Sequence, residues 1–329
     1  MFRILVTASE FGEADPRPEA ILRAAGCILM RSPYPRPARA RELLPLVGDA
    51  DGILAGWDEF SRRVLEAAPR LKVIARYGGG AGGVDLEAAT DLGIVITDTP
   101  EADTGAIADL TFALLLAVAR QIPAADRIAR RGGEERLMGV ELTGKTLGII
   151  GFQRVGRAVA RRARGFGMEL LAFDPAPDRD AAARLGVRLV SLDALLAASD
   201  LVAVHLPLTP KTRGLLDARK LRRMKPGAFL VSTAEAGVVD EEALLAALEA
   251  GTLAGVGLDA INRESLRSHF LPAPEFLVAT PGIAARTREA MARKSCRAAE
   301  DLLRVFRGER PAHVLNPEVY SRLGVRAVA

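Results

Sequence analysis

A glycine-containing segment in the middle of the chain has the residue types and spacing of a phosphate-binding loop. An apolar stretch runs into Gly151, Gln153 and Gly156, and a helical pattern begins within this loop. Asp174 follows 18 residues after Gly156, at the end of the next apolar stretch. A helix N-terminus attracts a pyrophosphate, and an acidic residue at this distance accepts hydrogen bonds from ribose hydroxyls. The segment therefore predicts a dinucleotide site that favours NAD over NADP.

Gln153 departs from the pattern, because the middle position of such a loop is normally a glycine that lets the backbone approach the phosphate. The Gln153 side chain can swing away, its amide can donate to the phosphate, or it can block the site. The backbone N–H groups of Arg154 and Val155 belong to the same helix start and would face the phosphate. Normal binding of NAD, and weakened or absent binding, both stay open at this point.

The elements that position this loop follow from an alternation of strand-like and helical segments along the chain. Such alternation predicts an α/β fold with parallel sheets and right-handed crossovers. The predicted strands are residues 2–7, 27–31, 52–55, 71–75, 94–96, 146–150, 169–173, 201–205, 228–232, 255–258 and 277–279. The predicted helices are residues 18–25, 62–67, 103–120, 155–165, 193–197, 241–250 and 286–307.

Composition narrows the class of protein. A chain of 329 residues is long enough for two domains, since single cores stop growing near about 250–300 residues. Its 49% hydrophobic and 26% charged residues are typical of a soluble globular protein. No apolar run approaches the roughly 18–20 residues of a membrane span, and no secretion signal pattern precedes the first strand. We expect a cytoplasmic protein with no membrane partner.

Cysteine usage and charge argue against a disulfide-stabilised, a metal-binding or a nucleic-acid-binding protein. Cys27 and Cys296 are the only cysteines and lack metal-ligand spacing, so we expect a reducing compartment and no bound metal. The net charge is only +4, and Arg161, Arg162 and Arg164 recur at helical spacing. They predict a solvated helix face, and we expect no nucleic-acid partner.

Motifs over almost the whole chain resemble those of the D-isomer-specific 2-hydroxyacid dehydrogenases, the family that includes phosphoglycerate dehydrogenase. They are residues 71–80, 84–89, 204–214, 224–234, 238–245 and 255–259, in the family's order and spacing. The resemblance implies two flavodoxin- and Rossmann-like domains with parallel sheets and a cleft between them. Residues 1–102 plus 286–329 would form a discontinuous substrate domain, and residues 103–285 the NAD-binding domain. It also implies a homodimer formed through the nucleotide domain.

The resemblance assigns residues to both ligands. The backbone amides of Gly79 and Gly80 would receive a substrate carboxylate. The cofactor side would comprise Gly151, Gln153, Arg154, Val155, Gly156, Asp174, His205, Pro207, Thr212, Ala234 and Asp259.

Two of the three positions that carry the family's chemistry hold other residue types. The reaction moves a hydride between nicotinamide and C2 of a 2-hydroxy or 2-keto acid. It uses a cation to hold the carboxylate and an imidazole to move the proton. Glu235 stands at the arginine position and Gly282 at the histidine position, whereas Glu264 keeps the orienting glutamate. A carboxylate in place of arginine inverts the charge that faces the substrate.

The chain has three histidines, His205, His269 and His313. Only His205 belongs to a segment expected near the cleft, where the family has a histidine that is not the acid/base group. Two interpretations stay open for His205: packing on the cofactor side, which we favour, or replacement of the missing acid/base group.

Three functions are compatible with these residues. The first, which we adopt, is an NAD-dependent oxidoreductase acting on a small molecule other than the ordinary 2-hydroxy acids. The second is a catalytically inactive, dinucleotide-responsive dimer. The third is isomerase or lyase chemistry by Glu235 and Glu264, because two neighbouring carboxylates push one pKa upward and give an acid and a base.

Overall fold

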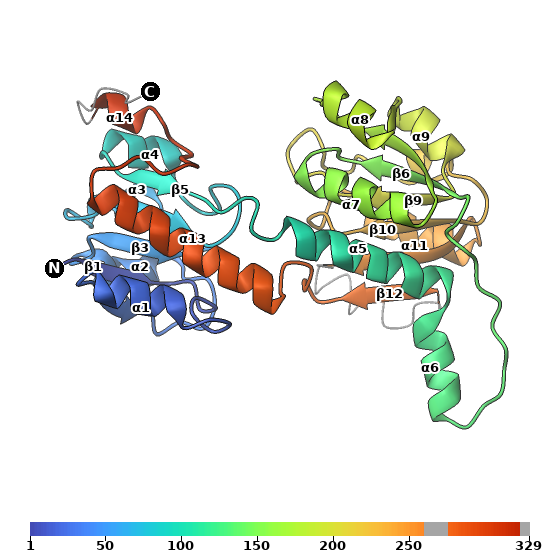
Figure 1. Cartoon of the computed structure of the whole chain (residues 1–329), viewed down its shortest axis with the longest axis horizontal. Coiled ribbons are helices and arrows are strands. Elements are labelled where there is room, and N and C mark those ends of the chain that lie inside the picture. Colours follow the sequence, from blue (N-terminus) through green and yellow to red (C-terminus); the bar gives the residue numbers. More distant parts are fainter. Residues whose placement is uncertain (260–275, 323–329) are drawn as a thin grey trace. The chain divides into compact units, whose positions relative to one another are not determined.

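The chain forms two compact units, each an α/β assembly with its own sheet (Figure 1). The computed structural model describes residues 1–259 and 276–322. The first unit comprises Met1–Asp103 and Arg286–Ala329, and the second comprises Thr104–Ala285. The predictions for Glu264 and His269 lie outside the described residues.

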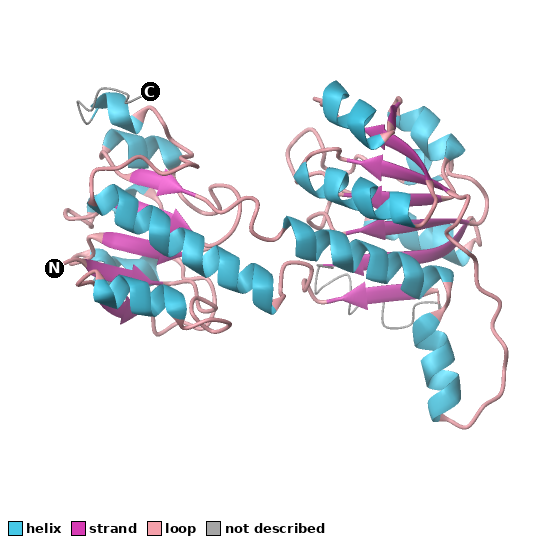
Figure 2. Ribbon diagram, viewed as in Figure 1, coloured by secondary structure: helices cyan, strands magenta, loops and turns pink. Residues whose placement is uncertain are grey.

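The first unit is built on a parallel sheet in the order β2-β1-β3-β4-β5 (Figure 2). Its strands are β1 (Arg3–Val6), β2 (Ile28–Arg31), β3 (Gly52–Ala55), β4 (Val73–Arg76) and β5 (Val95–Thr97). Its helices are α1 (Arg17–Ala24), α2 (Ala40–Val47), α3 (Arg62–Glu66), α4 (Leu86–Asp91), α13 (Arg288–Phe306) and α14 (Val319–Arg322). The strand order reverses at β1, which places a switch point between the carboxyl ends of β1 and β3.

Both faces of this sheet are covered by helices, so its strands are apolar on both sides. On one face Leu43 of α2 and Val64 of α3 pack with Ile53 and Ile74 of the sheet. On the other face Leu302 of α13 packs with strand residues of the opposite pleat. The C-terminal segment therefore completes the core that the N-terminal strands begin.

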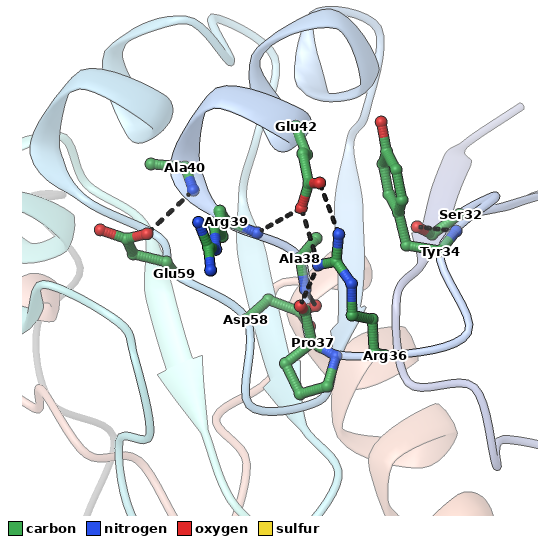
Figure 3. A network of polar contacts seen from close by, with 10 residues as sticks. All are labelled: Ser32, Tyr34, Arg36, Pro37, Ala38, Arg39, Ala40, Glu42, Asp58 and Glu59. Atoms are coloured by element: carbon green, nitrogen blue, oxygen red, sulfur yellow. Dashed lines mark hydrogen bonds and ion pairs between the residues drawn. The ribbon is translucent and has the colours of Figure 1, made fainter.

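A network of polar contacts fixes the start of α2 (Figure 3). The Glu42 carboxylate accepts two hydrogen bonds from Arg36, at 3.0 and 2.7 Å, and one from the backbone N–H of Arg39 at 2.9 Å. The Arg36 guanidinium is the main reason that the pKa of Glu42 falls to about 2. In the same network Asp58 accepts a hydrogen bond from the backbone N–H of Ala38 at 2.8 Å.

The second unit is built on a parallel sheet in the order β12-β11-β10-β9-β6-β7-β8. Its strands are β6 (Thr146–Ile150), β7 (Glu169–Phe173), β8 (Arg188–Leu189), β9 (Leu201–Val204), β10 (Ala228–Ser232), β11 (Leu253–Asp259) and β12 (Leu277–Thr280). Its helices are α5 (Thr104–Ala119), α6 (Ile122–Arg130), α7 (Arg154–Gly165), α8 (Arg179–Leu185), α9 (Leu192–Ala198), α10 (Ala218–Leu221) and α11 (Glu241–Glu249).

This sheet also carries a core on each face. Residues of α5, α7 and α8 pack on one face, and residues of α9, α10 and α11 pack on the other. The apolar run inside α5 is largely buried, as its composition predicts, whereas α6 projects from the body of this unit (Figure 1). Among the described residues no single helix meets the length and hydropathy of a membrane span; α5 and α6 do so only as a pair bent by 61°.

Every predicted strand and helix is present, with ends that differ by at most two residues. The α/β class and the parallel sheets are confirmed. The two-residue strand β8 and the helices α2, α4, α6, α8, α10 and α14 were not predicted. Most of these helices are too short for a clear apolar period. Asp85, Asp178 and Asp217, which cap α4, α8 and α10, are signals that would have located three of them.

A buried carboxyl group in α13 gives a stability prediction. Asp301 is only 4% exposed, and its Oδ2 has no hydrogen-bond partner within the described part of the chain. Burial is the main cause that raises the pKa of Asp301 to about 6. The folded state therefore favours the neutral form, whereas the unfolded chain ionises near pH 3.8.

We expect Asp301→Asn to stabilise the protein above pH 6. The wild type should lose stability as the pH rises from about 4 to 6, because only the folded state holds the proton there. The amide has no proton to lose, so the advantage of the variant should reach roughly 2–3 kcal/mol and then stay constant. Denaturant unfolding between pH 4 and 8 measures this, with the exposed Asp49→Asn as control. An advantage that does not grow with pH contradicts the prediction.

Candidate functional site

The loop after β6 requires a glycine at its first position. Gly151 has φ +97°, which L side chains rarely adopt. A Cβ there would lie 2.9 Å from the backbone N of Leu206 and 3.0 Å from the carbonyl carbon of His205. Gly151 thus lies beside the end of β9, where the strand order of the sheet reverses. Ligands of open α/β sheets bind at the carboxyl ends of the strands at such a point.

The first turn of α7 contacts the backbone of this loop at Gly156. A Cβ on Gly156 would lie 2.1 Å from the carbonyl oxygen of Gly151 and 3.1 Å from Cγ2 of Ile149. Because no side chain fits there, Gly156 lets the first turn of α7 lie directly against the end of β6.

Gln153 is accommodated without a glycine-only conformation. Its φ of −89° and ψ of −153° are extended, and it is the N-cap residue of α7. Its side-chain Nε2 donates a hydrogen bond to the carbonyl oxygen of Ala176 at 3.0 Å. Of the three alternatives for this side chain, the structure has the one in which it turns aside, toward the loop after β7.

The N-terminus of α7 offers free donors. No side chain caps this helix, and within the described residues the backbone N–H groups of Arg154, Val155 and Gly156 have no hydrogen-bond partner. Helix N-terminal N–H groups bind phosphate oxygens through hydrogen bonds and the helix dipole. The residues present therefore fit a dinucleotide pyrophosphate.

Asp174 is held in place at the carboxyl end of β7. Its Oδ2 accepts a hydrogen bond from the backbone N–H of Phe152 at 2.7 Å, and its Oδ1 accepts one from Ala176 at 2.8 Å. The residue is 8% exposed. Each oxygen keeps a second lone pair, so the carboxylate can still accept hydrogen bonds from ribose hydroxyls.

His205 lies at the end of β9 and pairs with a residue that the sequence patterns did not single out. Its Nδ1 is 2.8 Å from Oγ1 of Thr233, and its Nε2 is buried with no partner among the described residues. Burial lowers the pKa of His205 to about 3. A neutral imidazole of this kind is a poor proton donor near pH 7, which favours packing over replacement of the acid/base group.

Pro207, Thr212 and Ala234, which the resemblance assigns to the cofactor side, lie in turns at the same sheet edge. Oγ1 of Thr212 donates to the carbonyl oxygen of Pro207 at 2.6 Å, which closes the turn after β9. The backbone N–H of Ala234 donates to Oγ of Ser232 at 3.3 Å and starts the turn after β10.

Glu235 is exposed in this turn and borders a small hollow in the second unit. Glu241 and Asp259 also line the hollow, and no lysine or arginine belongs to its described lining. Arg213 reaches the end of the turn, with Nη1 at 3.6 Å from the Cβ position of Gly237. Glu235 therefore presents its carboxylate to solvent.

The backbone around Gly282 is held by Asp259. Asp259 accepts hydrogen bonds from Oγ1 of Thr280 at 2.6 Å, from the backbone N–H of Ile283 at 2.8 Å and from that of Ala284 at 2.8 Å. Gly282 itself has φ +75°, the left-handed region that favours glycine. In this chain the turn is thus shaped for glycine as well as lacking a histidine.

In the first unit the glycine loop after β4 is tied to the segment after β5. The backbone N–H of Gly80 donates to Oδ2 of Asp98 at 2.8 Å, and that of Gly78 donates to Oγ1 of Thr99 at 2.9 Å. The N–H of Gly79 has no partner in the described ranges. Asp98 was not predicted, although its position directly after β5 places it at the same sheet edge as the loop.

Comparison with known proteins connects this geometry to a family. Residues 112–284 match the family model described as the NAD-binding domain of D-isomer specific 2-hydroxyacid dehydrogenases. The D-3-phosphoglycerate dehydrogenase of Methanocaldococcus jannaschii is 38% identical over 84% of this chain and 53% of its own length. The chain thus spans about half the length of that relative. The glyoxylate reductase of Thermococcus litoralis is 38% identical over 84% of this chain and 87% of its own length.

Solved structures are similar over nearly the whole chain. The TT0316 protein from Thermus thermophilus superposes with a TM-score of 0.86 at 39% identity, covering 95% of this chain and 99% of that one. The apo D-lactate dehydrogenase from Escherichia coli has a TM-score of 0.82 at 29% identity, with the same coverage.

We predict that Gly156→Ala abolishes saturable NADH binding and lowers the free energy of unfolding by several kcal/mol. Its methyl group would have to push α7 away from the Gly151 carbonyl. Gly165→Ala is the matched control, because it lies in the same helix with nothing within 4 Å of its Cβ position. The control should be neutral or slightly stabilising. Equal behaviour of the two variants in NADH titration and thermal unfolding would contradict this account.

Gly282→His should not restore an ordinary active site. A side chain in the left-handed region costs about 1 kcal/mol, so we expect a similar fall in the free energy of unfolding and no gain in pyruvate reduction. Gly282→Ala should show the same loss and serves as control for the backbone effect. A histidine variant that is as stable as the wild type and reduces pyruvate would refute this expectation.

Proposed function

The chain belongs to the D-isomer-specific 2-hydroxyacid dehydrogenase family, and from this membership we propose an NAD-dependent oxidoreductase that acts on a small carbonyl compound other than the ordinary 2-keto acids. The observation that carries the proposal is the open N-terminus of α7, from which the Gln153 side chain turns aside to Ala176.

The nucleotide side of the proposal uses the second unit alone. The N–H groups of Arg154, Val155 and Gly156 hold the pyrophosphate of NAD, and Asp174 accepts hydrogen bonds from the adenosine ribose. Bound NAD supplies or accepts the hydride. The Asp174 carboxylate would repel a 2′-phosphate, so NADH is preferred over NADPH.

The substrate side of the proposal begins with the first unit. The first unit acts as the substrate domain, and its glycine loop after β4 contacts the substrate. Glu235 and Gly282 stand at the positions of the family's arginine and histidine. They supply neither the cation that holds a carboxylate nor an imidazole, so water or the substrate itself carries the proton.

A catalytically inactive, dinucleotide-responsive homodimer is the second candidate. The backbone of Gly282 favours it, because a turn set at φ +75° is poorly suited to a histidine. Apolar side chains on and after α6 give the dimer a surface: Ile122 is 54% exposed and Met138 is 88% exposed. Isomerase or lyase chemistry gains no such support, since it depends on Glu264, outside the described residues.

The deciding experiment is a calorimetric titration of the full chain with NADH and with NADPH, followed by NADH oxidation across a panel of aldehydes and ketones. We expect saturable NADH binding, weaker NADPH binding, and turnover of at least one carbonyl compound faster than pyruvate. NADH binding without any turnover would contradict the oxidoreductase and support the catalytically inactive, dinucleotide-responsive homodimer. Binding of neither nucleotide would refute both candidates.

A further inference from the structure

The loop after β7, residues 174–178, is tied to the loop after β6 within the second unit. Nε2 of Gln153 donates a hydrogen bond to the carbonyl oxygen of Ala176 at 3.0 Å. At the start of the same loop, the backbone N–H of Phe152 donates to Oδ2 of Asp174 at 2.7 Å. These contacts hold the loop that carries Asp174 closed against the start of α7.

Arg157, in the first turn of α7, ties the far end of this loop. Its Nη1 lies 3.1 Å from Oδ2 of Asp178, the N-cap residue of α8. Its Nε donates to the carbonyl oxygen of Phe152 at 3.2 Å. In sites that take NADP, an arginine near the acidic position accommodates the 2′-phosphate. Here the guanidinium of Arg157 is already paired with a carboxylate and a carbonyl group.

The closed loop offers few donors to an anion. Pro175 and Pro177 have no backbone N–H, and the N–H of Ala176 donates to Oδ1 of Asp174 at 2.8 Å. Residues 175–177 therefore have no free backbone donor. A ribose hydroxyl can donate a hydrogen bond to Asp174, whereas the oxygens of an ionised phosphate only accept. The closed loop thus suits a 2′-hydroxyl and not a 2′-phosphate.

Gln153 supplies a hydrogen bond that the glycine of the usual motif cannot make. Its backbone is extended, so the side chain reaches Ala176 without backbone strain. A hydrogen bond of this kind shifts an equilibrium by about fivefold. That is enough to change how often the loop after β7 opens.

We propose that Gln153 is a specificity-determining residue for the nucleotide. By holding the loop after β7 closed, it makes the site select a dinucleotide with a free 2′-hydroxyl and reject the 2′-phosphorylated form. An opened loop would release the N–H of Ala176 from Asp174 and make this donor free for a phosphate oxygen. The inference rests on the proposed oxidoreductase function and adds to the repulsion by the Asp174 charge, which acts whether the loop is open or closed.

The test is a calorimetric titration of the full chain with NADH and NADPH in the wild type, Gln153→Gly and Gln153→Met. Methionine is similar to glutamine in length but has no N–H to donate, so it separates the hydrogen bond from the bulk of the side chain. We expect the ratio of the NADPH Kd to the NADH Kd to fall about fivefold in both variants. A wild-type ratio in either folded variant overturns the inference.

Gln121→Met is the matched control. Nε2 of Gln121 donates to the carbonyl oxygen of Met138 at 2.8 Å, which is the same kind of hydrogen bond in the same unit. This variant should keep the wild-type ratio, and an equal fall would show a general loosening of the unit and overturn the inference. Hydrogen exchange of the Ala176 N–H without nucleotide should be faster in both Gln153 variants and unchanged in Gln121→Met. Unchanged exchange in the Gln153 variants contradicts the closed loop.

The outcomes distinguish this inference from the proposed function. If NADH binds and the Gln153 variants keep the wild-type ratio, the oxidoreductase function stands and the role of Gln153 is wrong. If the ratio falls as expected while no carbonyl compound is turned over, the role of Gln153 stands and the oxidoreductase function fails. If the wild type binds neither nucleotide, both are refuted.

Discussion

The contact between the start of α7 and the end of β6 is the constraint on which the nucleotide site depends. With a Cβ position only 2.1 Å from the Gly151 carbonyl, Gly156 leaves no room for a side chain, and Gly151 in turn adopts a φ of +97° beside the end of β9. These two glycines bring the helix N-terminus to the point where the strand order reverses. As a consequence, the free backbone N–H groups of Arg154 and Val155 lie at this point. The backbone N–H of Phe152 lies there too and donates to the Asp174 carboxylate.

The structure accommodates Gln153 at the position where the loop motif normally has a glycine. The middle position of the loop has an extended backbone in this chain, so a side chain brings no conformational strain. The amide then bonds to Ala176 in the loop after β7, two residues after Asp174, which carries the ribose-binding carboxylate in our proposal. The substitution therefore joins two loops of the nucleotide site.

Two turns of the second unit hold residue types other than those that the family resemblance predicts. At Gly282 the turn held by Asp259 adopts a left-handed conformation, and at Glu235 the sign of the exposed charge is inverted. In the first unit the carboxylate of Asp98 accepts the hydrogen bond of the Gly80 N–H and ties the glycine loop to the end of β5.

The α/β class, the parallel strands and the glycine-containing loop after β6 could be predicted from the residues alone. Those features are local, because apolar periodicity and glycine spacing are properties of short segments. Three further features came only from the folded chain: where Gln153 points, that Nδ1 of His205 lies beside Oγ1 of Thr233, and that Asp98 meets Gly80. Each of these depends on loops that follow different strands and meet only when the sheet forms, and sequence spacing carries no record of such meetings.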